Sequence, residues 1–145
     1  MRVEPLCVMD LEYTTDFYLV RPYGNESGTG WGVGKGRALG ETLAGDVQWS
    51  NQPRRRGDGV MLPNVRGVIT TPEGSEVFFD LTGRTMFVKI GDSEVGSQLL
   101  MTLFESEDDR YAWLNDTVCM TEGVIDPAKG TSHFVVNVCK NDLLV

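Results

Sequence analysis

One segment of the chain gathers the side chains best suited to holding an anion. It places an aromatic ring, an amide, three guanidinium groups and a carboxylate close together: Trp49, Asn51, Arg54, Arg55, Arg56 and Asp58. Adjacent guanidinium groups repel one another unless carboxylates or an anionic ligand compensate their charge. Either the arginines pair with surface carboxylates such as Asp46 or Asp58, or Arg54 and Arg55 hold a carboxylate, phosphate or enolate at the mouth of a cavity.

A second group of side chains follows further along the chain. It comprises Glu105, Asp108, Arg110, Tyr111, Trp113 and Asn115, with Glu122 in the next apolar stretch. Residues 106–114 form a short segment that could plug one end of the domain. Alternatively, Tyr111, Trp113 and Asn115 line a ligand pocket, and burial makes Glu105 or Glu122 a general acid or base.

The chain contains a single histidine, His133, which we count as a candidate ligand-binding residue. With no G-x-S-x-G motif and no marked Cys–His pair, the sequence disfavours covalent hydrolysis. One histidine with scattered acids does not match the spacing of metal ligands, so we expect no intrinsic metal. Without a βαβ pattern or a phosphate loop, we also expect no cofactor.

Composition narrows the possible partners. The formal net charge is −8, with 13 Lys and Arg against 21 Asp and Glu, which argues against nucleic acid and against a membrane surface. We find neither a secretory signal nor an apolar span and expect a soluble, cytoplasmic protein. Cys7, Cys119 and Cys139 are odd in number and widely spaced, which predicts buried free thiols.

Short apolar stretches with turn residues between them predict a β-meander over a single domain, residues 1–145. The expected strands are 6–13, 17–21, 40–50, 60–71, 76–87, 96–105, 118–125 and 132–139. Pro72-Glu73-Gly74 reads as a tight turn between two of them. Residues 106–114 open with Ser106 and acidic side chains, which predicts one short helix.

An antiparallel sheet of this size removes its edges most simply by closing, so we predict an all-β barrel of about eight strands. A two-sheet sandwich is the alternative. Residues 24–36 carry glycine at every second position from Gly28 to Gly36. We interpret this segment as a mobile hairpin loop, or else as a bare face that a ligand or another backbone approaches closely.

Read in order, several short segments resemble one known family. They are Trp49-Ser50-Asn51, Asp58-Gly59, Gly67-Val68-Ile69-Thr70-Thr71, Gly83-Arg84, Phe104-Glu105-Ser106 and, most specifically, Arg110-Tyr111-Ala112-Trp113-Leu114-Asn115. The chain is similar over nearly its whole length to the bacterial family catalogued as domain of unknown function 3237. The resemblance implies a small barrel related in shape to the calycins, and it carries over no catalytic residue.

Two functions of different class remain open. The first is a cofactor-independent isomerase, cyclase or lyase for a small apolar or aromatic carbonyl compound, with Glu105 or Glu122 as the base. In it, Arg55 and Tyr111 would donate to an oxyanion, and Trp49 and Trp113 would form walls. The second is a non-catalytic barrel that binds a small ligand or assembles with copies of itself through an edge strand.

Overall fold

The computed structural model describes residues 1–144, whose regular secondary structure is β-strand apart from a short 3₁₀ helix. The strands are β1 (Arg2–Tyr13), β2 (Tyr18–Val20), β3 (Gly28–Leu39), β4 (Gly45–Asn51), β5 (Arg54–Arg55), β6 (Met61–Leu62), β7 (Asn64–Thr70), β8 (Glu76–Ile90), β9 (Ser93–Glu105), β10 (Val118–Asp126) and β11 (Thr131–Lys140). The helical turn, η1, covers Ala112–Asp116.

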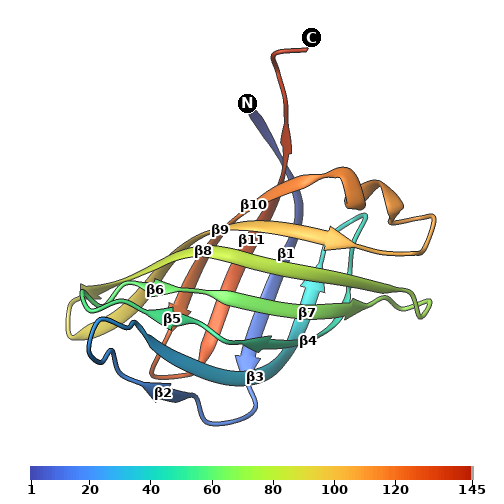
Figure 1. Ribbon diagram of the computed structural model, residues 1–145. Helices are drawn as coiled ribbons and strands as arrows, with labels where there is room; N and C mark the ends of the chain where they lie inside the picture. The colour runs from blue at the N-terminus through green and yellow to red at the C-terminus, as the bar shows by residue number, and fades with distance from the viewer. Residues whose placement is uncertain (145) are drawn as a thin grey trace.

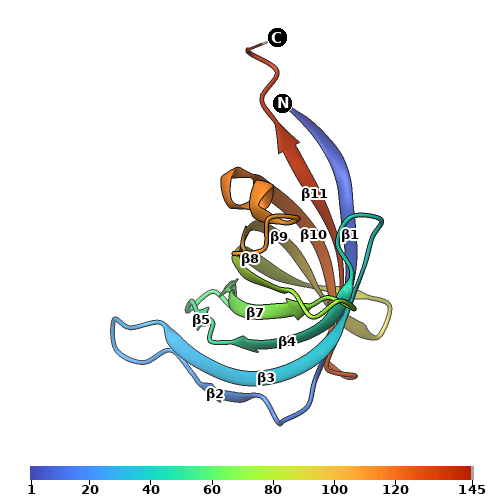
Figure 2. The same ribbon diagram turned by 90° about the vertical axis from the view of Figure 1, so that its right-hand side faces the viewer.

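Eight of these strands close into an antiparallel barrel. Their order is β1–β11–β10–β9–β8–β7–β4–β3, and β3 pairs with β1 to complete the ring. Strands β2, β5 and β6 are short additions to it (Figures 1 and 2). Each barrel strand therefore has a neighbour on both sides, which leaves no long edge open to another chain. The predicted eight-stranded barrel is confirmed.

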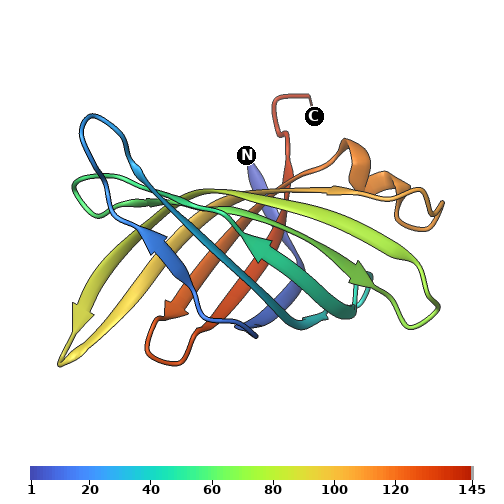
Figure 3. The same ribbon diagram turned by 60° about the horizontal axis from the view of Figure 1, so that its bottom comes forward.

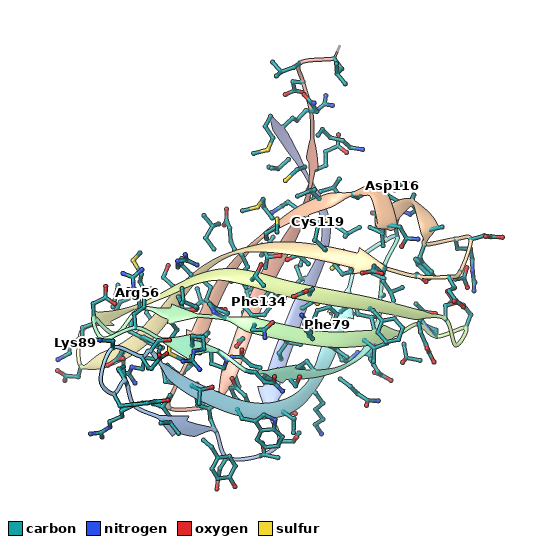
Figure 4. All side chains as sticks on the ribbon, viewed as in Figure 1. Arg56, Phe79, Lys89, Asp116, Cys119 and Phe134 are labelled. Atoms are coloured by element: carbon teal, nitrogen blue, oxygen red, sulfur yellow. The ribbon has the colours of Figure 1, made fainter. Side chains whose placement is uncertain are left out.

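The barrel interior is filled from alternate positions of every strand. Along β9, Leu100, Thr102 and Phe104 are buried, whereas the residues between them face outward. The same alternation places Phe79 of β8 and Phe134 of β11 in one core cluster, and Figure 4 shows both in the middle of the molecule. Such a two-residue period is what a half-buried antiparallel strand requires.

The glycine-rich segment is a strand and not the mobile hairpin loop that we favoured. Residues 28–39 form β3, which pairs with β1 and β4. Its glycines provide the space that neighbouring rings occupy: a Cβ on Gly30 would lie 2.5 Å from the Phe17 ring, and one on Gly32 would lie 2.6 Å from the Tyr13 ring. The alternative of a bare face approached closely is the one that the structure supports.

Two further expected elements differ from the structure, and one turn agrees with it. The predicted helix over 106–114 is wrong in its bounds, because only Ala112–Asp116 is helical. The predicted strand 60–71 is broken at Pro63, which separates β6 from β7 because proline has no N–H for the ladder. The predicted turn is confirmed, since Gly74 has φ +90° and donates its N–H to Thr71 O at 2.9 Å.

The two ends of the barrel differ. At the closed end, Tyr111 and Leu114 belong to the core cluster, so the segment before β10 plugs this end. At the other end, which we call the mouth, β1 and β4 finish and β9 begins. The β2–β3 and β8–β9 hairpins project at the mouth (Figure 3), and Figure 4 labels Arg56 and Lys89 there and Asp116 at the closed end. Within residues 1–144, no helix is long and apolar enough to cross a membrane.

Candidate functional site

A cavity of about 400 Å³ opens at the mouth and reaches the barrel interior. Its lining includes aromatic, apolar and amide side chains, among them Tyr13, Phe17, Asn51, Met61, Thr85 and Gln98. Asn51, Thr85 and Gln98 are buried, so the cavity extends below the surface of the barrel wall. A volume of this size is typical of a pocket for one small molecule.

Tyr13 and Asn51 form the first polar pair of this cavity. Tyr13 is the last residue of β1 and points inward with Met9 and Leu11, while Asn51 is the last residue of β4. Asn51 Nδ2 donates to Tyr13 Oη at 3.2 Å, and Asn51 Oδ1 accepts from the backbone N–H of Asn64 at 3.2 Å. The backbone contact fixes the orientation of the amide, so the amide presents a donor to the phenol.

The Tyr13 ring is held by two other aromatic rings. Trp49 meets it edge-on with the ring centroids 4.6 Å apart, and Phe17 lies 5.4 Å away on a tilted plane. The Trp49 indole is itself anchored, because its Nε1 donates to Lys35 O at 3.0 Å. This packing leaves the phenol little freedom and positions its hydroxyl group at the cavity wall.

Burial raises the pKa of Tyr13, and the hydrogen bond from Asn51 opposes that rise. The phenol is therefore protonated at neutral pH. Because its oxygen already accepts from Asn51, the hydroxyl proton is available to an acceptor inside the cavity. Tyr13 is thus a hydrogen-bond donor in a mainly apolar pocket.

Gln98 and Thr85 form the second polar pair. Gln98 Nε2 donates to Thr85 Oγ1 at 2.7 Å, and both side chains are buried. The Oε1 atom of Gln98 has no hydrogen-bond partner within residues 1–144. A buried acceptor without a partner costs about 1–3 kcal/mol.

Two side chains of opposite charge stand at the rim of the cavity, Asp16 and Lys129, and both are exposed. No group of three or more His, Cys, Asp and Glu side chains that could hold a metal ion occurs within residues 1–144. The cavity therefore offers a phenol, two amides and a hydroxyl inside, with charge confined to its entrance.

The four residues expected to be catalytic do not meet. Glu105 and Glu122 are exposed on the outer wall of the barrel, so the burial predicted for them is wrong. The reason is the strand period: Glu105 follows inward-facing Phe104, and every second residue faces solvent. Arg55 is half-buried in β5 beside the mouth, whereas Tyr111 lies at the closed end.

Tyr111 has a structural role at the closed end. Its hydroxyl donates to Glu73 Oε1 at 2.6 Å, and this bond raises the pKa of the phenol and lowers that of the carboxyl. Asp108 accepts from Arg110 Nη2 at 2.8 Å, and Arg110 Nη1 lies 3.3 Å from Glu73. Of the two alternatives for residues 106–114, a plug and a pocket lining, the plug fits the structure, because the bonds to Glu73 tie this segment to the β7–β8 turn.

Among the predicted ligand-binding residues, Asn51 lines the cavity and Trp49 supports it through Tyr13. The others lie elsewhere. Arg54 donates to Ser27 on the outside, Trp113 is 44% exposed at the closed end, and Asn115 holds the backbone of Ser106 with both amide atoms. His133 is exposed, with Nδ1 2.6 Å from Asp10 Oδ1. Arg56 pairs with the Asp58 carboxylate, which agrees with the prediction that the arginines pair with surface carboxylates.

The sequence patterns alone did not lead us to Tyr13, Phe17, Thr85 and Gln98. A usable signal was present: Thr85 lies an even number of residues from Phe79 and Leu81, and Gln98 lies two residues before Leu100. Polar residues at inward positions near strand ends mark the end of a barrel where the core gives way to a pocket.

Comparison with known proteins supports the barrel fold but identifies no activity. No protein-family model matches the sequence, and no curated protein does; the resemblance to domain of unknown function 3237 therefore stays a prediction. Solved structures do match. A β-barrel-like protein from Acinetobacter baumannii aligns with a TM-score of 0.84 and 16% identity, covering 96% of each chain.

Two further structures share the fold. A protein of unknown function from Clostridium acetobutylicum has a TM-score of 0.82 and 13% identity, covering 97% of this chain and 100% of its own. A structure described as an enzyme from Penicillium herquei has a TM-score of 0.63 and 15% identity, covering 96% of this chain and 98% of its own. Identities this low show a common barrel fold alone.

Proposed function

We propose that the protein binds a small aromatic or otherwise apolar carbonyl compound in the mouth of the barrel. The observation that carries this proposal is the Tyr13 hydroxyl, which is held by Asn51 and keeps a free proton inside a cavity of about 400 Å³. A ligand carbonyl that accepts this proton satisfies the donor, and the ligand ring packs against Phe17 and Met61.

We prefer a binding function to a catalytic one because the buried part of the cavity contains no carboxylate. Its buried polar side chains are Asn51, Thr85 and Gln98, and the carboxylate of the lining, Asp16, stands at the rim. An uncharged interior favours holding a ligand over abstracting its protons. Neither a cofactor nor a metal is part of the proposed function.

The test is calorimetric titration with 4-hydroxyacetophenone, an aromatic ketone that also carries a hydroxyl group. Tyr13→Phe removes the donor and keeps the ring, so we expect binding at least about tenfold weaker. Tyr18→Phe is the matched control, because Tyr18 is exposed on β2 and should leave the affinity unchanged. Equal affinity in the Tyr13→Phe variant and the unaltered protein would contradict the proposal.

A second candidate is a cofactor-independent isomerase, cyclase or lyase acting in the same cavity, and one observation favours it: Asp16 and Tyr13 line the same space. The Asp16 carboxylate would take the proton from the carbon next to the carbonyl while the Tyr13 hydroxyl hydrogen-bonds the enolate oxygen, and proton return would complete the cycle. NMR in D₂O would detect deuterium entering the methyl group of 4-hydroxyacetophenone faster than in buffer, and Asp16→Asn should abolish the difference.

A further inference from the structure

The outer wall over β8, β9 and β10 carries a continuous group of exposed apolar side chains, which we call the β9 face. Its members are Phe78, Met86, Leu99, Met101, Leu103, Val118 and Val124. Leu99 is 58% exposed, although it lies near the middle of the strand ladder. Single exposed apolar residues are ordinary, but a contiguous set of this kind marks an interaction surface.

The strand registers fix how this face is arranged. Leu99 lies between Arg84 of β8 and Glu122 of β10. One step along, Met101 lies between Thr82 and Met120. The face is therefore three strands wide, with an apolar row on β9 and unlike side chains on its two flanks.

Arg84 and Glu122 carry opposite charges that are unpaired in the described part of the chain. Neither belongs to an ion pair within residues 1–144. Arg84 Nη1 donates to the adjacent carbonyl of Gly83 at 2.8 Å, which leaves the charge of the guanidinium uncompensated. Both side chains are exposed on the same side of the sheet as Leu99.

Consider a second copy laid on this face by a two-fold rotation about an axis along β9. The rotation exchanges the flanks, so β10 of the second copy lies over β8 of the first. Arg84 then stands opposite Glu122 of the second copy, and Glu122 opposite its Arg84. Met86 meets Val124 in the same way, and Met101 meets its own counterpart at the centre. The face is therefore complementary to itself around its centre, in charge at Arg84 and Glu122 and in apolarity at Met86, Val124 and Met101.

We propose that this protein forms a homodimer through the β9 face, with the two sheets packed face to face about a two-fold axis that passes over Met101 and is inclined slightly to β9. The long Arg84 and Glu122 side chains can follow the crossing angle of roughly 30° that twisted sheets adopt when they pack. Ser97 and Glu105 lie on β9 at the two ends of the apolar row. Glu105 approaches its own counterpart there, so this end of the interface must stay in the solvated polar rim, where water screens like charges. This interface is on the barrel wall and is independent of the mouth cavity.

Sedimentation velocity over micromolar to millimolar concentrations tests the dimer. The unaltered chain should associate. Arg84→Glu or Glu122→Arg alone places like charges opposite each other and should weaken association at least about tenfold. The combined variant Arg84→Glu, Glu122→Arg restores opposite charges across the axis and should recover association. Arg21→Glu makes the same change of charge on the exposed β2–β3 hairpin and should have no effect.

Circular dichroism melts would confirm that each variant is folded. A chain that stays monomeric at millimolar concentration overturns the proposal. The proposal is also overturned if the combined variant associates as weakly as the single reversals. Arg84 and Glu122 would then not face each other across the two-fold axis.

Cross-linking gives a second measurement. In a Cys139→Ser background, Met101→Cys should form a disulfide-linked dimer on mild oxidation, because Met101 meets its counterpart at the axis. Trp31→Cys, at an exposed position on β3, should not. Equal cross-linking at both positions would show random collision and would overturn the assigned face. So would a disulfide between the Met101→Cys thiol and a different protein, formed without any self-linked dimer.

Discussion

The Tyr13 phenol owes its properties to its immediate neighbours. Its oxygen accepts from Asn51 across 38 residues of chain, and its ring is fixed by Trp49 and Phe17. Trp49 and Asn51 could be picked out from the sequence because an aromatic and an amide stand beside three arginines. Tyr13 could not, because only the pairing of β1 with β3, and of β3 with β4, brings these residues together.

The buried thiols predict a pH dependence of stability. Burial raises the pKa of Cys7 from 9.0 to about 12 and that of Cys119 to about 11. Below pH 9 both thiols are protonated in the folded and unfolded chain, so their contribution is fully present. Above it the unfolded chain loses protons first, and the free energy of unfolding should fall by about 1.4 kcal/mol per pH unit for each thiol.

Urea denaturation between pH 9 and pH 11 measures this slope. Cys7→Ala removes one titrating thiol and should make the slope shallower, whatever its effect on stability at neutral pH. A slope equal to that of the unaltered chain would mean that Cys7 does not titrate in this range. All three thiols are free, as predicted, and the predicted burial is confirmed for Cys7 and Cys119 but not for Cys139, which is half-buried.

At the scale of elements, β3 determines the shape of the mouth. All eight expected strands overlap strands of the structure: seven overlap barrel strands and 17–21 overlaps the short strand β2, because their apolar alternation is visible without a fold. The expected strand 60–71 overlaps both β6 and β7. β3 was not expected as a strand because glycine is poor in β propensity; here the adjoining rings supply the packing that its own side chains lack.

Gly32→Ala tests this role of β3. The added Cβ would lie 2.6 Å from the Tyr13 ring and 2.9 Å from the Phe17 ring, so both must move. We expect a loss of about 1–3 kcal/mol in the free energy of unfolding, together with weaker binding of 4-hydroxyacetophenone. Chemical denaturation and calorimetry would measure the two effects.

Gly57→Ala is the control, because a Cβ there meets no atom within 4 Å. If the two variants were equally stable and bound the probe equally well, the glycine face would not be needed to seat the rings.

The whole molecule is a barrel closed by the pairing of its first strand with β3. That a sheet of this size closes could be predicted from the need to remove its edges, and the barrel was correctly preferred to the sandwich. The candidate site could not be predicted in the same way. Which polar residues meet depends on which end of the barrel is plugged, and the plug is tied down by long-range bonds such as Tyr111 to Glu73.

The asymmetry of the two ends predicts different sensitivity to mutation. Glu73→Gln weakens the bond to Tyr111 at the closed end and should lower the melting temperature while the affinity for 4-hydroxyacetophenone is retained. Differential scanning calorimetry and titration of the same sample would separate the two effects. Lost affinity without lost stability would place the binding site at the closed end.

The assignment of the mouth cavity as the binding site can be mapped residue by residue. Backbone amide NMR shifts would be followed while 4-hydroxyacetophenone is added to the unaltered protein. We expect the largest changes around Tyr13, Thr85 and Gln98, and no response from Tyr111 and Leu114 at the closed end. Changes centred on the closed end or on the β9 face, or no change at saturating probe, would contradict the assignment.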